Sequence, residues 1–139
     1  MPKRYDYFEH KADVGIIGIG TTLPEAFEEA AKAMFNLMYD VEKVEPLKEI
    51  QIKCEANNSE ELFVEWLNAL LAQANIHELA LGEFQVTEIK GSQLKGYAKG
   101  EPLDAQRHDP KTEVKAATYA MLNVGKKGKE YVAECVVDV

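Results

Sequence analysis

The sequence has few cysteines and no long hydrophobic run. No apolar stretch reaches the roughly 20 residues that a membrane-spanning helix needs, and the N-terminal segment Met1–Asp6 has no apolar stretch behind its basic residues, as a signal peptide would have. We therefore expect a cytoplasmic protein without membrane association. The two cysteines, Cys54 and Cys135, form no C-x-x-C pair and lie in alternating apolar segments. This pattern favours small buried hydrophobic residues over a thiol-based zinc or redox site.

Basic residues are also scarce, with 16 Lys and Arg against 24 Asp and Glu, for a net charge of −8. Affinity for nucleic acids comes largely from Lys and Arg that displace counterions, so direct binding to RNA or DNA is disfavoured. The one basic cluster, Lys126-Lys127 with Lys129, lies in a glycine-flanked turn and is typical of a solvated hairpin tip. An acidic surface instead suits cations and basic protein partners.

Motifs for nucleotide binding and catalysis are missing. Gly15, Gly18 and Gly20 precede a predicted helix, but their spacing is G-x-x-G-x-G and no Walker-type G-K-[ST] follows. We interpret these glycines as allowing a strand to pack closely on that helix. No Ser/His/Asp or Cys/His arrangement has a recognisable signature, and the three histidines are scattered. The spacing by itself therefore indicates no catalytic site.

The length of 139 residues fits a single domain over residues 1–139. Thr22 followed by Glu25 predicts a capping box at the start of a first helix, and apolar residues recur behind it at helical spacing. A second helix is expected to begin at Asn58 or Ser59. Its apolar stripe includes Trp66, which we assign to the core.

Alternating apolar residues predict strands on either side of these helices. Polar residues over 102–111 predict a turn-rich segment, and the glycine-flanked stretch 125–128 predicts a hairpin turn. Two main helices with strands mostly in hairpins indicate an α+β domain, with the helices packed against a largely antiparallel sheet. The predicted strands are 5–9, 14–20, 48–55, 84–89 and 94–100, followed by the two β-rich segments 112–124 and 129–139.

Two carboxylates are placed where a cation could be bound. Asp13 lies just ahead of an apolar strand, and Asp138 stands beside the α-carboxylate of Val139 at the end of another. If these groups meet, their oxygen atoms would select a hard divalent cation such as Ca²⁺, Mg²⁺ or Mn²⁺. The alternative is that Asp13 caps a turn and the terminus is solvated. From the residues alone, this second interpretation is favoured.

Several blocks in this sequence resemble one known family. They share their order and run from residue 10 to the last residue, so the resemblance covers essentially the whole chain. Together they are similar to the archease family. The blocks are His10-x-Ala12-Asp13-Val14-Gly15-Ile16, Gly20-Thr21-Thr22-Leu23-x-Glu25-Ala26-Phe27-x-x-Ala30-Ala31, Leu67-Asn68-x-Leu70-Leu71, Glu113-Val114-Lys115-Ala116-Ala117-Thr118-Tyr119 and Val137-Asp138-Val139.

The resemblance implies an α+β domain that assists an enzyme and is not itself one. Archeases are understood as accessory proteins of the RtcB-type RNA ligase, which joins RNA ends in tRNA splicing with GTP and manganese. They promote guanylylation of the ligase and let it turn over repeatedly. By this resemblance Asp13, Asp138 and the oxygens of Val139 form a metal site, with Ca²⁺ the expected ion. His10 and Lys115 match positions near it, and Lys115 is expected to contact a phosphate or an acidic group of the ligase.

Two alternatives from other classes stay open. A general chaperone, a role also proposed for archeases, should expose a large apolar patch, whereas the apolar stripes here are better explained as core. A metal-dependent hydrolase would use Asp13, Asp138 and His10, but no motif places a general base among them. The ligase activator is therefore the leading hypothesis.

Overall fold

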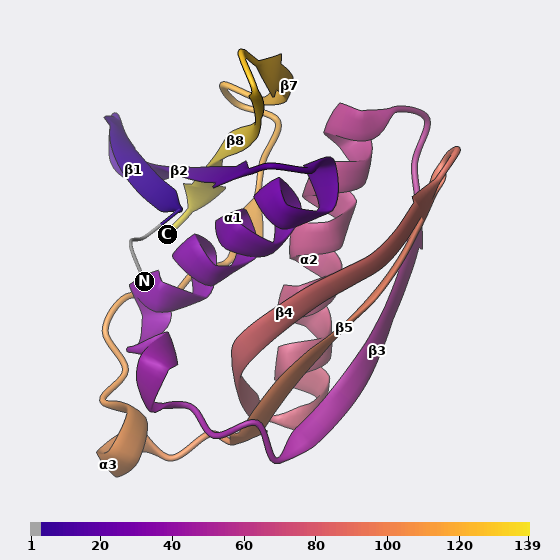
Figure 1. The fold of residues 1–139 in the computed structure, drawn as a ribbon. Coiled ribbons are helices and arrows are strands. Elements are labelled where there is room, and N and C mark those ends of the chain that lie inside the picture. Colours follow the sequence, from indigo (N-terminus) through magenta and orange to yellow (C-terminus); the bar gives the residue numbers. More distant parts are fainter. Residues whose placement is uncertain (1–3) are drawn as a thin grey trace.

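The fold, shown in Figure 1, is that of a computed structural model that describes residues 4–139. Residues 1–3 lie outside this description. They belong to the segment Met1–Asp6, for which the sequence predicts no signal peptide. The elements in chain order are β1 (Tyr5–His10), β2 (Asp13–Gly20), α1 (Leu23–Met38), the 3₁₀ turn η1 (Val41–Lys43), β3 (Lys48–Glu55), α2 (Ser59–His77), β4 (Leu79–Lys90), β5 (Gln93–Pro102), α3 (Ala105–His108), β6 (Ala116–Ala117), β7 (Asn123–Lys127) and β8 (Glu130–Asp138).

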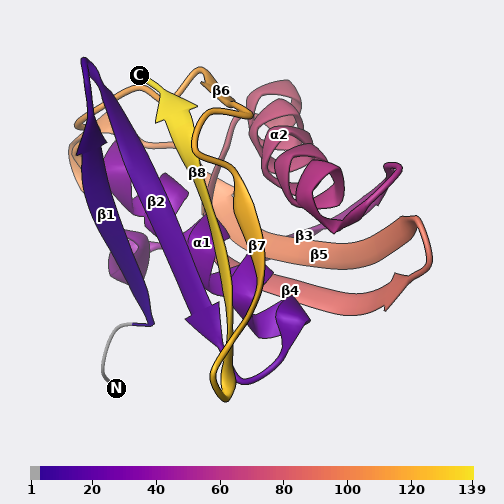
Figure 2. The ribbon, with the colours of Figure 1, turned by 90° about the horizontal axis from the view of Figure 1, so that it is seen from above.

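The strands form two antiparallel sheets with α1 between them. The larger sheet, which we call sheet A, has the order β1-β2-β8-β6, and β7 also pairs with β8. The smaller one, sheet B, has the order β3-β5-β4. Helix α1 packs on β2 and β8 on one side and on β4 on the other, while α2 packs on β3, β5 and β6 (Figures 1 and 2). The predicted α+β fold is confirmed. Within residues 4–139, no helix is long and apolar enough to cross a membrane.

Both main helices begin where the sequence predicts. The hydroxyl of Thr22 accepts the Glu25 N–H at 3.2 Å, and the Glu25 carboxylate accepts the Thr22 N–H at 3.2 Å, which completes the capping box. At the start of α2, the side chain of Asn58 accepts the Glu61 N–H at 2.8 Å. The two caps satisfy backbone donors that a helix start leaves without partners.

The hydrophobic core lies between the helices and the sheets. Trp66 is fully buried, as predicted, and its indole N–H donates to the Phe27 carbonyl at 3.0 Å, which links α2 to α1. Both cysteines are free thiols. Cys135 is buried and Cys54 is half-buried, and burial raises their pKa to about 12 and about 11. They act as small apolar residues rather than as reactive thiols.

Two glycines of β2 allow the close approach of α1. A Cβ added at Gly18 would lie 2.1 Å from the Ala26 carbonyl oxygen, and one at Gly20 would lie 2.4 Å from Cβ of Glu25. The strand-on-helix interpretation is confirmed at these positions. It is wrong for Gly15, where an added Cβ would meet the ring of Phe8 at 2.2 Å on the neighbouring strand β1.

The C-terminal third differs from the sequence prediction. Of the β-rich segment expected over 112–124, only the two residues of β6 and the start of β7 are strand. The stretch 111–115 instead crosses the end of α1, where the Lys111 N–H donates to the Met38 carbonyl at 2.7 Å. The hairpin turn lies at 128–129 rather than 125–128, because Lys127 still pairs with Glu130. Gly128 has a φ of 67°, which suits the turn, whereas Gly125 lies inside β7.

The start of β4 and the polar segment 102–111 also differ. Strand β4 begins at Leu79, before Gly82 rather than after it, because Glu78 reverses the chain directly behind α2 with a φ of 53°. The polar segment contains the short helix α3, which Asp104 caps by accepting the Gln106 N–H at 2.9 Å. Its last residue, His108, is buried, and so is Glu101 at the end of β5. The sequence predicted a turn-rich segment at His108 and assigned no element to Glu101.

His108 and Glu101 form a fully hydrogen-bonded pair. The Asp104 N–H donates to Nδ1 of His108 at 2.9 Å, so Nδ1 is an acceptor and Nε2 carries the proton. Nε2 then donates to the Glu101 carboxylate at 3.0 Å, and the Glu45 N–H donates to the same oxygen at 2.8 Å. Arg107 adds a longer contact to Glu101 at 3.5 Å. The pair fastens the end of β5 to two connections, the one before β3 through Glu45 and the one after β5 through His108.

Replacing Glu101 is expected to reduce the dependence of stability on pH. The hydrogen bonds from the Glu45 N–H and from His108, and then the charge of Arg107, hold the pKa of Glu101 below its ordinary value of 4.5. The stability that the ionised carboxylate contributes is therefore complete above about pH 4.5 and is lost as the pH falls through the folded-state pKa. In urea titrations, Glu101→Gln should lower the midpoint at neutral pH and flatten the decline in acid.

The matched control is Glu88→Gln, which removes an exposed glutamate of β4 and should leave both midpoints near those of the wild-type chain. A Glu101→Gln variant with the acid profile of the wild-type chain would show that this carboxylate does not carry the effect.

Candidate functional site

The C-terminus of the chain meets the β1–β2 hairpin at one end of sheet A. Strands β2 and β8 are antiparallel, and the register pairs Val14 with Val137. One residue further along each strand, Asp13 faces Asp138. The Val139 N–H donates to the Asp13 carboxylate at 3.3 Å. Residues that are 125 or more positions apart in the sequence are thus brought together by strand pairing (Figure 2).

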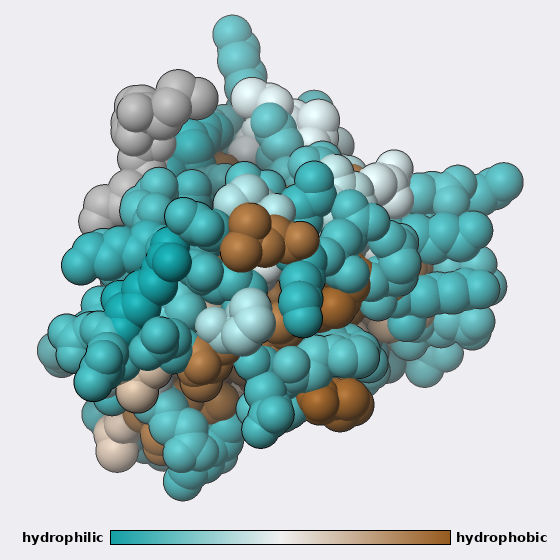
Figure 3. Space-filling view, turned by 90° about the horizontal axis from the view of Figure 1, so that it is seen from below, coloured by the Kyte–Doolittle hydropathy of each residue, from teal (hydrophilic) through white to brown (hydrophobic). Residues whose placement is uncertain are grey.

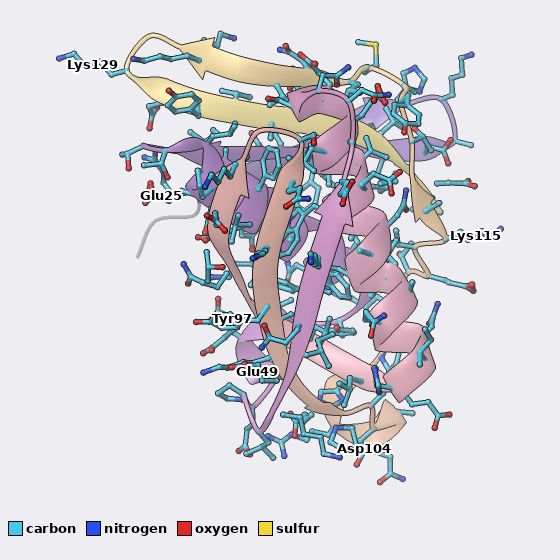
Figure 4. The ribbon with its side chains drawn as sticks, turned by 90° about the vertical axis from the view of Figure 1, so that its right-hand side faces the viewer. Glu25, Glu49, Tyr97, Asp104, Lys115 and Lys129 are labelled. Carbon is cyan, nitrogen blue, oxygen red and sulfur yellow. The ribbon has the colours of Figure 1, made fainter. Side chains whose placement is uncertain are left out.

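The other two predicted residues lie beside this carboxylate pair. His10 is the register partner of Asp13 across the β1–β2 hairpin. Lys115 precedes β6, not within a strand as expected, and its N–H donates to the Asp138 carbonyl at 2.8 Å. Its side chain is exposed and projects away from the ribbon (Figure 4). The structure therefore brings all five predicted site residues into one neighbourhood.

The described residues provide no ion-pair partner for Asp13 or Asp138. Within residues 4–139, no Lys, Arg or His nitrogen lies within 4.0 Å of the Asp13 or Asp138 carboxylate. The donor set for a cation is accordingly made of oxygen atoms, which suit hard divalent ions. In the described range, no group of three or more His, Cys, Asp and Glu side chains is arranged to hold a metal. A cation here would depend on the two aspartates together with the oxygens of Val139.

A residue that the sequence reading did not assign holds this end in place. Asn68 lies on α2, and its side chain donates to the Ala117 carbonyl at 3.1 Å and accepts the Ala117 N–H at 2.8 Å. This amide pair fixes β6, and with it the backbone of Lys115, to the helix. The sequence signal for this role was a polar asparagine within an apolar helix stripe, because an amide that faces the core needs hydrogen-bond partners.

A cavity of about 320 Å³ opens between α1, α2 and the segment that leads to β6. Its walls include the apolar side chains of Met38, Leu71 and Leu103, and Glu113 and Lys115 stand in its lining. Lys115 therefore borders both this cavity and the carboxylate pair. The cavity places apolar surface next to the charged end of sheet A.

Comparison with known proteins gives consistent results over nearly the whole chain. Residues 5–139 match the model of the archease protein family (MTH1598/TM1083). The protein archease of Sulfolobus acidocaldarius is 36% identical over 137 residues, which cover 98% of this chain and 99% of that protein. The protein archease of Methanosarcina mazei is 38% identical over 141 residues, covering 99% and 97%.

Solved structures share the fold as well. The solution structure of protein 1598 from Methanobacterium thermoautotrophicum superimposes with a TM-score of 0.86 at 30% identity, covering 99% of this chain and all of that one. A crystal structure from Thermotoga maritima, described as an archease and possible chaperone, has a TM-score of 0.65 at 20% identity over 95% of this chain and supports the fold alone. With a family match from residue 5 to the last residue and full-length relatives well above 30% identity, the chain belongs to the archease family.

Proposed function

We propose that this chain is an accessory protein that activates an RtcB-type RNA ligase in tRNA splicing. It promotes the GTP-dependent guanylylation of the ligase and its repeated turnover, and performs no catalytic step itself. The observation that carries the proposal is the meeting of Asp13, Asp138 and Val139 beside Lys115 in a chain of the archease family. These residues match the positions at which the family resemblance places its functional site.

We further propose that Asp13, Asp138 and the oxygens of Val139 hold a divalent cation. Two carboxylates at opposed strand positions repel each other when, within residues 4–139, no basic nitrogen lies within 4.0 Å of either, and a cation between them would offset that repulsion. Oxygen ligands favour Ca²⁺, with Mn²⁺ and Mg²⁺ as the alternatives. The cation would join the first residue of β2 to the last residues of the chain.

The overall charge fits a protein partner rather than RNA. With a net charge of −8, the surface is repelled by phosphate backbones and attracted to basic surfaces. A ligase that binds RNA carries such a basic surface. The activator can therefore approach the ligase without competing for its substrate.

The direct test mixes the purified chain with the RtcB-type ligase of the same organism and GTP. We expect more guanylylated ligase and several rounds of RNA joining for each ligase molecule, where the ligase alone completes fewer. Equal turnover with and without the chain would refute the proposed function. GTP hydrolysis by the isolated chain that Asp13→Ala abolishes would support the hydrolase alternative instead.

Lys115→Ala is expected to lower activation about tenfold, as for the loss of one charge-assisted contact of about 1.4 kcal/mol. Because the side chain is exposed, the free energy of unfolding should change by less than about 0.5 kcal/mol. The matched control is Lys53→Ala, which removes an exposed lysine of β3 in sheet B. If both variants activate as the wild-type chain does, Lys115 has no part in the contact.

A general chaperone is the second candidate, and its support is weaker. Five large apolar side chains are strongly exposed within residues 4–139, namely Leu47, Ile76, Leu103, Tyr119 and Met121. On the face shown in Figure 3, the hydrophobic groups are divided by hydrophilic side chains rather than joined in one broad patch. A broad apolar surface is what an unselective chaperone requires.

A further inference from the structure

The connection between β6 and β7 presents two large apolar side chains to solvent. Tyr119 is 57% exposed and Met121 is 61% exposed, although the intervening chain runs close to β8. Tyrosine and methionine are enriched at protein interfaces, where they supply large contact areas. We call residues 118–122 the β6–β7 loop.

This loop is held in a defined conformation. The Thr118 N–H donates to the Val136 carbonyl at 3.0 Å, and the Val136 N–H donates to the Ala120 carbonyl at 3.0 Å. The Thr118 hydroxyl adds a bond to the Val136 carbonyl at 2.7 Å and accepts the Ala120 N–H at 3.2 Å. The bonds on both sides of Tyr119 fix the backbone that carries the exposed ring.

Met121 has a backbone conformation that a non-glycine residue adopts at a cost. Its φ is 54°, in the left-handed region, where a side chain typically costs about 1 kcal/mol. The chain keeps a methionine there and directs it to solvent, where it gains no core packing. Strain of this kind is concentrated at binding and catalytic sites.

The loop is next to the candidate functional site. Val136, to which the loop is bonded, lies two residues before Asp138 on β8, or about 7 Å along the strand. Lys115 directly precedes β6, and Tyr119 is the second residue after it. The loop that carries Tyr119 and Met121 and the carboxylate pair are therefore neighbours along β8.

We propose that Tyr119 and Met121 are the apolar anchors by which the chain docks on its ligase, in an apolar pocket bordered by basic groups. This inference rests on the proposed function. The surface area of two side chains is far smaller than the roughly 800 Å² that each partner buries in a stable interface. They act as the central contact, and the charged end of sheet A supplies the surrounding polar rim.

Charge argues for a basic partner rather than a second copy of this chain. A symmetric dimer through this loop would place the same surface on both subunits. The Asp13 and Asp138 carboxylates of one copy would then approach those of the other, in a chain whose net charge is already −8. A basic ligase surface reverses the sign of that interaction.

The test compares the double variant Tyr119→Ala/Met121→Ala with a control, Leu47→Ala/Ile76→Ala. Leu47 and Ile76 are 67% and 68% exposed, and neither belongs to sheet A or its connections. The ligase is immobilised, and binding is measured alongside guanylylation over a range of activator concentrations. We expect the loop variant to bind at least about tenfold more weakly, as for a lost interface hot spot, and to reach the wild-type maximal turnover at saturation. The control should bind as the wild-type chain does.

Met121→Gly is a second test in case the double variant misfolds, because glycine adopts the same positive φ without strain. This variant should also weaken binding to the ligase. Unchanged ligase affinity in both loop variants, with a wild-type chain that activates, would overturn this inference alone. A wild-type dimer in sedimentation that the loop variant dissociates would also overturn it, in favour of a second copy. A wild-type chain that neither binds nor activates the ligase would overturn the proposed function, and this inference with it.

Discussion

Asp13→Ala and Asp138→Ala are each expected to remove the rise in melting temperature that Ca²⁺ produces in the wild-type chain. A cation that binds only the folded state stabilises it by mass action, by about 2.7 kcal/mol at a hundredfold excess over the dissociation constant. Each substitution removes one of the two side-chain carboxylates that meet beside Val139. If the cation matters to the partner, both variants should also lose ligase activation. The measurements are thermal melts with and without Ca²⁺ and the guanylylation assay.

The control for charge is Asp6→Ala, which removes an exposed carboxylate from the far end of β1. It should melt and activate as the wild-type chain does. A chain extended beyond Val139 tests the remaining ligand, because the extension replaces a terminal carboxylate with an amide. If the extended chain still gains stability from Ca²⁺, the terminal carboxylate is not a ligand, while Asp13 and Asp138 keep their place. A Ca²⁺-induced rise that survives in both aspartate variants would place the cation elsewhere.

Gly18→Ala is expected to destabilise the fold by about 3 kcal/mol, at the upper end for overpacking. The added Cβ would lie 2.1 Å from the Ala26 carbonyl oxygen and 2.4 Å from the Ala30 nitrogen. These are backbone atoms of α1, which cannot rotate away as the end of a flexible side chain can. Helix and strand would have to separate, and the separation would disturb buried contacts of the core. The measurement is the free energy of unfolding from urea titration.

Gly125→Ala makes the same chemical change in β7, where no heavy atom lies within 4 Å of the new Cβ and φ is not positive. It should be neutral or stabilising by a few tenths of a kcal/mol, because alanine reduces the entropy of the unfolded chain. Equal stability of the two variants would mean that α1 can move off β2 at little cost. The consequence would reach the site, because the same strand begins with Asp13.

The sequence predicted best where the cause is local. Thr22 with Glu25 and Asn58 with its first turn define helix starts through contacts three residues apart, and both caps are present. Trp66 was assigned to the core from helical spacing alone, and it is fully buried. The hairpin turn was placed too early because two glycines flank the basic residues and only Gly128 has the positive φ. Spacing alone did not distinguish a strand glycine from a turn glycine.

Other features depend on partners that are distant in the chain. His108 lies in the polar segment 102–111 and Glu101 directly precedes that segment, and nothing near them in sequence indicates burial. The residue that completes their network is Glu45, whose N–H belongs to the connection before β3. Asn68 likewise finds Ala117 49 residues away. Such contacts follow from how the sheets and helices pack, and a local pattern carries no information about them.

The sequence by itself determined the two helices, most of the strands, the acidic surface and the family, because these depend on spacing, charge and the order of short blocks. Spacing and charge did not predict the candidate site, since for one aspartate near the beginning of a chain and another at its end they favoured a turn cap and a solvated terminus. Only the tertiary structure brought them together. Antiparallel pairing of β2 with β8 sets Asp13 opposite Asp138, and the register of that pairing is fixed by the apolar residues that both strands bury against α1.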